Sequence, residues 1–267
     1  MATVIDSHAI VSPKALLGDN VSVGPFTIVE AGAVICDGSS IGGNALIGVG
    51  ARIGKNCKIH HGAVIGHVPQ DLKYAGEPTT CELGERTVVR EFATIHRGTG
   101  EGGRTIVGCD CFLMGYIHIA HDCVIGDNVI IANGAMMAGH TEVGNMVIIG
   151  GLTAIHQFTR IGQHAMIGGG LRLGKDVPPY ILAGNEPICF EGLNSIGLRR
   201  RGFRREVLDA LDRTYELVYR SKLNVSQALA AIEADSTLSA VAEVRNVIEF
   251  IRNSKRGIIR GPRLIHH

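Results

Sequence analysis

The chain has 267 residues and a net charge of +1, and its 45% apolar and 19% charged residues are typical of a globular protein and argue against disorder. Its 36 glycines, 4% aromatic content and lack of tryptophan favour a core of small and β-branched side chains over one filled with rings. No apolar run approaches the roughly 18 residues of a membrane span, and the first residues lack a signal-like pattern, so we expect a cytoplasmic protein without a membrane span.

The cysteines and the charge distribution narrow the class further. Seven cysteines, an odd number without a CxxC pair, predict reduced thiols instead of a disulfide scaffold. Residues 197–260 hold 13 Lys and Arg against 8 Asp and Glu, whereas residues 1–196 hold 12 against 17. A basic C-terminal part indicates an acidic partner. We do not expect nucleic acid, because no stacking aromatic residues accompany the arginines.

A six-residue period dominates the first two thirds of the chain. Aliphatic residues stand six apart from Ile5 to Ile65, and the same phase returns at Leu83, Val89 and Ile95 and again from Val107 to Leu173. Six matches neither the 3.6-residue period of a helix nor the 2.0-residue period of a strand. Three short strands and three turns of this kind close one coil of about 18 residues, so residues 1–186 are expected to form a parallel β-helix.

After Pro178 and Pro179 the period changes. From about Phe203 the apolar spacing is helical in two stretches, Val207–Val218 and Leu238–Ile251. We therefore expect residues 187–267 to form a C-terminal helical domain that covers the end of the β-helix, whose open edge otherwise invites strand pairing.

Two insertions interrupt the repeat without changing its phase. They run from His67 to Cys81 and from Thr99 to Thr105. Because a β-helix alone performs no chemistry, loops extruded from it are the first places to look for a site. The chemically varied side chains of the first insertion favour function over a spacer.

Histidines gather in the coils that follow the insertions. His121 and His140 lie within one position of the same corner on neighbouring coils, so their side chains are expected to converge. The HxxH spacing of His118 and His121 also suits zinc, but side chains three apart on a β-coil are not expected to face one way. The preferred interpretation is general-base catalysis by a neutral imidazole, oriented by the adjacent Asp122.

Several motifs in this region resemble the UDP-N-acetylglucosamine acyltransferase family of lipid A biosynthesis. They are IHRGT from Ile95, HIAHDC from His118, AGH from Ala138, AIHQF from Ala154, PQDLKYAGEPT from Pro69, DVPPY from Asp176 and GLRRRGF from Gly197. A sister N-acyltransferase fits less well, because it carries a large extra N-terminal domain and here the repeat starts at Ile5. The resemblance implies a left-handed coil, against the usual right-handed crossover.

The resemblance also implies an activity: transfer of an (R)-3-hydroxyacyl chain from acyl carrier protein to the 3-hydroxyl of UDP-N-acetylglucosamine, the first step of lipid A biosynthesis. His121 matches the family's general base, with Asp122 beside it, and the Gly139 amide would stabilise the oxyanion. No cofactor or metal is implied. The expected substrate-binding residues are Gln70, Asp71, Lys73, His96, His118, His140, His156, Gln157, Asn194, Arg200 and Arg201.

Three further expectations come from the same resemblance. Gly169 matches the position that sets acyl length, and glycine there leaves room for a longer chain. Ile196 replaces a carboxylate that contacts the nucleotide in the family, which affects uracil binding. The family forms homotrimers with sites between subunits, which agrees with flat faces that need a partner.

Two other function classes remain open at this stage. A zinc lyase of the γ-carbonic anhydrase type shares the β-helix and the histidines between subunits, and it predicts stoichiometric zinc and sensitivity to chelators. A non-catalytic scaffold predicts that His121→Ala leaves function intact.

Overall fold

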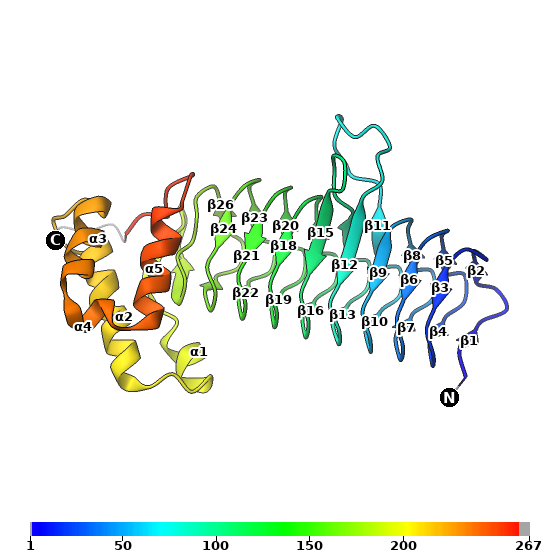
Figure 1. Ribbon diagram of the computed structural model, residues 1–267, viewed down its shortest axis with the longest axis horizontal. Coiled ribbons are helices and arrows are strands. Elements are labelled where there is room, and N and C mark those ends of the chain that lie inside the picture. Colours follow the sequence, from blue (N-terminus) through cyan, green and yellow to red (C-terminus); the bar gives the residue numbers. More distant parts are fainter. Residues whose placement is uncertain (1, 262–267) are drawn as a thin grey trace.

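The computed structural model describes residues 2–261, which form a long three-sided coil with a group of helices at its C-terminal end (Figure 1). Parallel strands from successive coils make up the three sides. Within residues 2–261, no helix has both the length and the apolar character needed to cross a membrane.

The first sheet contains β1 (Val4–Ile5), β4 (Ser22–Val23), β7 (Ser40–Ile41), β10 (Lys58–Ile59), β13 (Val88–Val89), β16 (Phe112–Leu113), β19 (Ile130–Ile131), β22 (Ile148–Ile149), β25 (Met166–Ile167), β27 (Ile181–Gly184) and β28 (Cys189–Leu193). The second contains β2 (Ile10–Val11), β5 (Ile28–Val29), β8 (Leu46–Ile47), β11 (Val64–His67), β14 (Thr94–His96), β17 (His118–Ile119), β20 (Met136–Met137), β23 (Ala154–Ile155) and β26 (Arg172–Leu173). The third contains β3 (Leu16–Leu17), β6 (Val34–Ile35), β9 (Ala51–Ile53), β12 (Thr80–Leu83), β15 (Arg104–Val107), β18 (Val124–Ile125), β21 (Glu142–Val143) and β24 (Arg160–Ile161).

This architecture confirms the left-handed parallel β-helix expected from the sequence. The second residue of each two-residue strand points inward and stacks on its counterpart one coil away, as Ile119 does on Met137. The small residues expected in the corners, such as Ala45 and Ala135, are also buried. Side chains of matched size repeat at the strand spacing of about 4.8 Å, so the interior is one continuous aliphatic core.

The chain passes from the first sheet to the second, then to the third, and back to the first. We name its corners the 1–2, 2–3 and 3–1 corners after the sheets they join. Many corner residues have positive φ, including Asp122 (58°), His140 (58°) and Phe158 (61°) on three successive coils of the 2–3 corner. Non-glycine residues adopt this conformation at a cost, and the surrounding hydrogen-bonded coil holds them in it.

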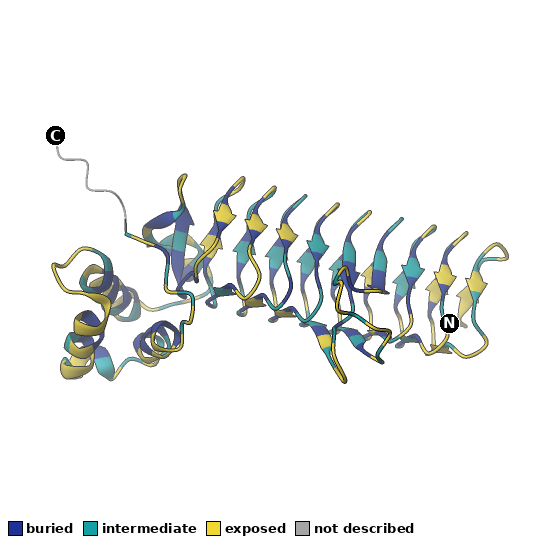
Figure 2. Cartoon of the chain, turned by 90° about the horizontal axis from the view of Figure 1, so that it is seen from above, coloured by how far each residue is buried: buried dark blue, intermediate teal, exposed yellow. Residues whose placement is uncertain are grey.

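The two ends of the coil differ. At the N-terminal end (Figure 2), the inward-facing Ile5 is 45% exposed because no coil lies below it. At the other end β28 pairs antiparallel with β27 and closes the first sheet. The expected helical part thus begins with a strand at Cys189–Leu193, since these residues complete the open sheet edge before the first helix starts.

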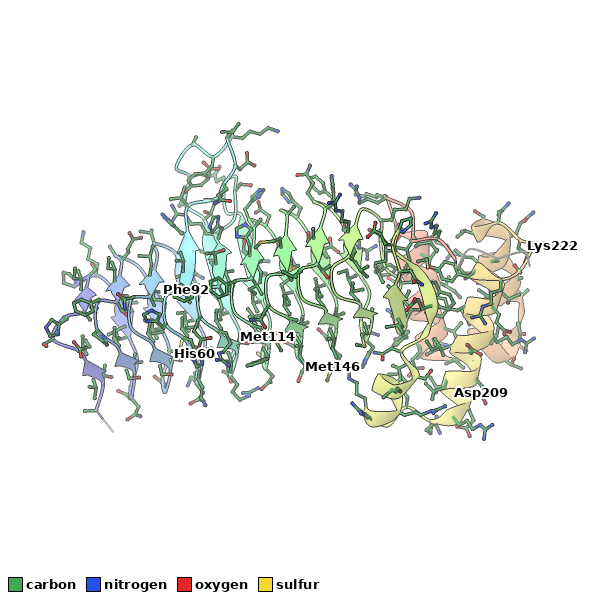
Figure 3. The ribbon with its side chains drawn as sticks, turned by 180° about the vertical axis from the view of Figure 1, so that it is seen from behind. His60, Phe92, Met114, Met146, Asp209 and Lys222 are labelled. Carbon is green, nitrogen blue, oxygen red and sulfur yellow. The ribbon has the colours of Figure 1, made fainter. Side chains whose placement is uncertain are left out.

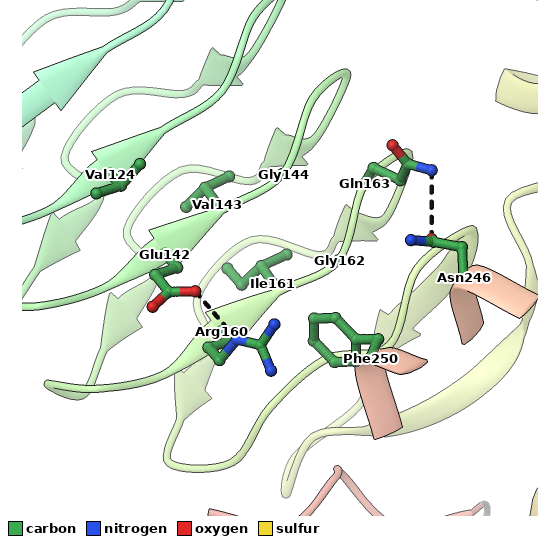
Figure 4. Close-up of a pocket in the computed structure, with 10 residues that line it drawn as sticks. All are labelled: Val124, Glu142, Val143, Gly144, Arg160, Ile161, Gly162, Gln163, Asn246 and Phe250. Carbon is green, nitrogen blue, oxygen red and sulfur yellow. Dashed lines mark hydrogen bonds and ion pairs between the residues drawn. The ribbon is translucent and has the colours of Figure 1, made fainter. Parts of the chain in front are cut away.

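Five helices follow within the described residues: α1 (Ser195–Arg200), α2 (Arg205–Tyr219), α3 (Val225–Ala234), α4 (Ser236–Ser239) and α5 (Ala242–Arg252). The two helical stretches expected from the spacing appear as α2 and as α4 with α5. Helix α5 packs on the third sheet, where the Arg160 guanidinium lies 4.7 Å from the centre of the Phe250 ring and Gln163 donates to Asn246 (Figure 4).

The cysteines are all unpaired, as expected. Cys81 and Cys123 are buried in the coil, and burial raises the pKa of both thiols to about 12. A protonated, enclosed thiol is a small apolar filler instead of a nucleophile.

Candidate functional site

Both insertions leave the coil at the 2–3 corner, one directly after the other. The first lies between β11 and β12 and projects from the molecule (Figure 1), and the second lies between β14 and β15. They hold each other in place: the Tyr74 hydroxyl accepts from Arg97 Nη2 at 2.9 Å, and a Glu77 oxygen accepts from the Gly100 amide at 2.7 Å. The two loops therefore form one wall above the next coil of the corner.

His121 and Asp122 occupy that next coil. The His121 Nδ1 and Asp122 Oδ2 atoms lie 2.8 Å apart, and because a carboxylate only accepts, Nδ1 carries the proton. The second loop fixes the carboxylate in turn, since the Thr99 hydroxyl donates to Asp122 Oδ2 at 2.6 Å and the Thr99 amide donates to both oxygens at 3.1 Å. In the tautomer with the proton on Nδ1, Nε2 has a lone pair that can accept a proton.

His140 and Gly139 complete the corner from the following coil. The rings of His121 and His140 are 5.2 Å apart, so the convergence expected from the sequence is confirmed. A Cβ at position 139 would stand 2.5 Å from His121 Cε1, so only glycine allows this approach. No hydrogen bond within residues 2–261 uses the Gly139 amide, which is left as a donor beside the imidazole.

Two more histidines form a row on the second sheet. His118 contacts His96 with ring centres 4.9 Å apart, and its Nδ1 lies 2.7 Å from the Thr94 hydroxyl. Burial, with His118 nearby, lowers the pKa of His96 to about 4, and burial also lowers the pKa of His118. Both rings are therefore neutral at pH 7 and can donate or accept hydrogen bonds without bringing charge.

One cavity of about 420 Å³ is lined by His118, His121 and Gly139 together. Its lining consists of Gln70, His118, Ala120, His121, Met136, Met137, Ala138, Gly139, Ala154, Ile155 and Gln157. Our expectation that His118 and His121 face different ways was wrong, because the chain turns the corner between them and brings both onto the same hollow. Its lining thus combines polar side chains with methionine and aliphatic ones.

The remaining residues expected near this corner lie at its rim. Asp71 Oδ2 is 3.8 Å from His121 Nε2 and so faces the free nitrogen. Lys73 is exposed on the same loop, with its amide donating to Asp71. His156 is exposed one coil beyond His140, next to Gln157, whose carbonyl lies 3.1 Å from His156 Nδ1.

The residues expected at the nucleotide end lie elsewhere in the chain. Asn194 donates to the His164 carbonyl at 3.0 Å, and Arg201 Nη1 lies 3.2 Å from His164 Nδ1, which places both at the 3–1 corner. Arg200 and Ile196 are exposed on α1 beside them. Gly169 lies at the 1–2 corner, next to Gly151. A single chain therefore does not bring these residues together with His121.

Three residues of the corner could also gather around a metal ion. Ligand atoms of His121, Asp122 and His140 all lie within 4.8 Å of one another. Asp122 Oδ2, however, already accepts from the Thr99 hydroxyl and from His121 Nδ1, so ligation of a metal through Oδ2 would compete with these hydrogen bonds. The donor set is therefore arranged as a hydrogen-bonded dyad.

The sequence reasoning missed the residues that fix this dyad. Thr99 and Thr105 were named only as the bounds of the second insertion and were given no role, although the Thr105 hydroxyl accepts from the Asp122 amide at 2.9 Å. Phe158, whose ring stacks on His140 at 4.7 Å, was also missed. The only signal for the two threonines was their position at the two ends of an insertion.

The comparisons with known proteins agree with this geometry. The model described as bacterial transferase hexapeptide (six repeats) matches residues 14–49 and 104–139, and the one described as UDP N-acetylglucosamine O-acyltransferase, domain 2, matches residues 176–259. The acyl-[acyl-carrier-protein]–UDP-N-acetylglucosamine O-acyltransferase of Thiobacillus denitrificans is 42% identical over 261 residues, 97% of this chain and 100% of the relative. The enzyme of the same name from Janthinobacterium is 44% identical over the same shares.

Solved structures give the same result. The UDP-N-acetylglucosamine acyltransferase of Bacteroides fragilis is 46% identical and superposes with a TM-score of 0.93, covering 96% of this chain and 99% of that one. The enzyme from Francisella novicida, 34% identical, has a TM-score of 0.93 over 98% of this chain and 100% of its own. The resemblance seen in the motifs is confirmed, and the chain belongs to the UDP-N-acetylglucosamine O-acyltransferase family.

Proposed function

We propose that this protein transfers an (R)-3-hydroxyacyl chain from acyl carrier protein to the 3-hydroxyl of UDP-N-acetylglucosamine, the first step of lipid A biosynthesis. The observation that carries the proposal is the His121 and Asp122 dyad, with Nδ1 and Oδ2 2.8 Å apart at the mouth of a partly apolar cavity. Relatives that cover 97% of the chain bear this activity in their names. We propose that it acts in the cytoplasm, where its unpaired thiols would stay reduced.

The chemistry follows from the free nitrogen of His121. Nε2 takes the proton of the sugar 3-hydroxyl as its oxygen attacks the thioester carbonyl carbon, and Asp122 stabilises the resulting imidazolium. The Gly139 amide donates to the oxyanion of the tetrahedral intermediate. When the C–S bond breaks, His121 returns the proton to the departing thiolate, so no cofactor is needed.

The rim residues would hold the acceptor. Asp71 faces His121 Nε2 and can accept from a sugar hydroxyl, while Gln70 and Gln157 offer amides from either side of the cavity. His96 Nδ1 is buried and finds no partner within residues 2–261, so it is available to a polar group in the row that leads to His118. Lys73 adds a positive charge for the diphosphate.

The outward faces of the sheets support a homotrimer. Outward side chains on the first sheet are largely apolar, among them Phe112, Ile130 and Ile148, whereas those on the third include Arg52, Glu82, Glu142 and Arg160. The 1–2 corner carries the exposed side chains of Phe26, Phe92, Tyr116 and Leu152, and Leu152 is 77% exposed. Phe92 is labelled in Figure 3, which shows the molecule from the side of this corner. A row of exposed apolar side chains of this kind is typical of a surface that another subunit covers.

A threefold axis along the 1–2 corner satisfies both observations. It packs the second sheet of one protomer against the first sheet of the next and leaves the charged third sheet in water. The 2–3 corner with His121 then meets the 3–1 corner of the neighbour, which supplies Asn194, Arg200 and Arg201 for the nucleotide. Ile196 lies there as well, 68% exposed, and offers the uracil an apolar surface instead of a carboxylate.

The same packing gives the acyl chain a path. From the thioester at His121, the chain would cross Met136 and Ala154 on the second sheet toward Gly169 at the 1–2 corner. Both adjoining positions there, Gly151 and Gly169, are glycines. The path is open at its end, and we propose a longer acyl chain.

The test is mass spectrometry of products formed from UDP-N-acetylglucosamine and a panel of 3-hydroxyacyl carrier proteins. We expect one acylated sugar nucleotide, and His121→Ala should lower kcat about a thousandfold without changing the melting temperature. His8→Ala, which removes an exposed imidazole at the N-terminal end, is the matched control and should leave kcat unchanged. If no panel member is used, or if His121→Ala stays active, the proposal is wrong.

The zinc lyase is tested with the same protein. Elemental analysis is expected to find zinc well below one per chain, and chelator treatment should leave the transfer rate unchanged, because Asp122 is held by Thr99. Stoichiometric zinc that is lost together with activity would favour the lyase.

A further inference from the structure

We propose that a second cavity, on the third-sheet side of the 2–3 corner, binds the phosphate of the donor's phosphopantetheine arm. This inference deepens the proposed function and rests on it. The cavity measures about 660 Å³ and is lined by His140, Glu142, Phe158, Arg160, Asp176, Asn253, Lys255 and Arg256. His140 therefore lines it while also contacting the His121 ring, so the cavity adjoins the reacting groups.

The lining is arranged to attract an anion. Three cationic side chains face two carboxylates, and both carboxylates are already engaged. Glu142 Oε2 accepts from Arg160 Nε at 3.0 Å, while the buried Asp176 accepts from the Arg160 amide at 2.9 Å and from the Ser254 hydroxyl at 2.6 Å. Since Glu142 offsets Arg160, Lys255 and Arg256 face the single remaining carboxylate of Asp176, and the lining keeps a net positive charge that favours an anion.

The segment that carries these two cations is fixed to the coil. After α5 the chain returns to the β-helix, where Arg256 Nε donates to the Gly174 carbonyl at 3.0 Å and the Asp176 amide donates to the Gly257 carbonyl at 3.0 Å. Arg256 uses only Nε in that bond, and its two terminal nitrogens can still form a fork toward a phosphate. Lys255 is exposed and adds a point charge.

The distance of the cavity from His121 fits the phosphate of the acyl donor better than the diphosphate of the sugar nucleotide. His121, His140, Phe158 and Asp176 follow one another along the corner, so Asp176 is three coils, or roughly 14 Å, from His121. An extended pantetheine arm places its phosphorus roughly 15 Å from the thioester sulfur, while the nearest phosphorus of the sugar nucleotide is only about 6 Å from the 3-hydroxyl. The end of the cavity at Asp176 and Arg256 therefore lies at the distance of the phosphate of the arm.

The experiment compares acyl-phosphopantetheine with acyl-pantetheine, which lacks the phosphate, as small donors for the wild type and for Lys255→Glu. We expect the wild type to use the phosphorylated donor with about tenfold higher kcat/KM, and Lys255→Glu to lose that preference. The KM for UDP-N-acetylglucosamine should stay within twofold. Lys222→Glu, at the far end of the helical domain in Figure 3, reverses the same charge away from the site and should keep the preference.

Two outcomes would overturn the inference. One is an unchanged preference in Lys255→Glu, and the other is a rise in the KM for UDP-N-acetylglucosamine alone, which would assign the cavity to the nucleotide diphosphate. If the proposed function itself is wrong, the result differs from both of these, because the wild type would then transfer an acyl chain from neither donor. Melting temperatures of the variants check that the exposed substitutions leave the fold intact.

Discussion

Thr99 shows how much of the site depends on residues that do not touch substrate. Its hydroxyl and its amide both donate to Asp122, so it holds the carboxylate in the plane where the carboxylate accepts from His121. The His121 ring is fixed through its hydrogen bond to Asp122. The second insertion supplies the contacts that hold Asp122, which agrees with its place directly before the coil that carries His121.

We therefore predict that Thr99→Val lowers kcat about tenfold with little change in either KM, since a hydrogen bond to a charged group contributes about 1.5–3 kcal/mol. Thr99→Ser keeps the hydroxyl and should restore most of the rate. Steady-state kinetics of the three proteins measure this. Equal losses in the Val and Ser variants, or a change confined to KM, would show that Thr99 serves the fold and not the dyad.

At the scale of elements, α5 joins the helical domain to the β-helix through one aromatic contact. Phe250 is buried against the third sheet under the Arg160 guanidinium, which also bonds Glu142 (Figure 4). This contact fixes the direction in which the chain leaves α5, and so the position of Lys255 and Arg256. On the first sheet, the pairing of β28 with β27 likewise ties the start of the helical domain to the β-helix.

Phe250→Ala should lower the free energy of unfolding by about 3 kcal/mol, because it removes a buried ring and leaves a cavity beside Arg160. Urea denaturation of the purified variant measures the change. Leu223→Ala, which truncates an exposed side chain between α2 and α3, is the comparison and should cost far less. Equal effects would mean that α5 is not anchored by this ring.

At the scale of the whole molecule, the separation of His121 and Arg201 on different corners makes a sharp prediction. His121→Ala and Arg201→Ala trimers should each be nearly inactive, yet trimers assembled from an equal mixture should recover about one quarter of wild-type activity, because one interface in four combines an intact His121 with an intact Arg201. Mixing after reversible dissociation and assaying the product measures it. No recovery above the sum of the two variants would place the whole site within one chain.

The sequence by itself determined the coil, because a six-residue period fits neither a helix nor a single strand. It also located the candidate catalytic corner, because His121 and His140 stand 19 positions apart on coils of 18. It also identified α2 and α5 from their helical spacing. It did not reveal that Cys189–Leu193 pair as a strand, since that choice depends on an open edge made by residues far earlier in the chain.

Only the tertiary structure decided which side chains act together. His118 and His121 line one cavity despite their spacing, because a corner separates them. Thr99 and Thr105 bond Asp122 because the second insertion leaves the coil and returns to it beside this residue. The tertiary structure also carried Lys255 and Arg256 back to the β-helix across the helical domain. Contacts of this kind join residues that are 17 to 93 positions apart, and no local pattern encodes them.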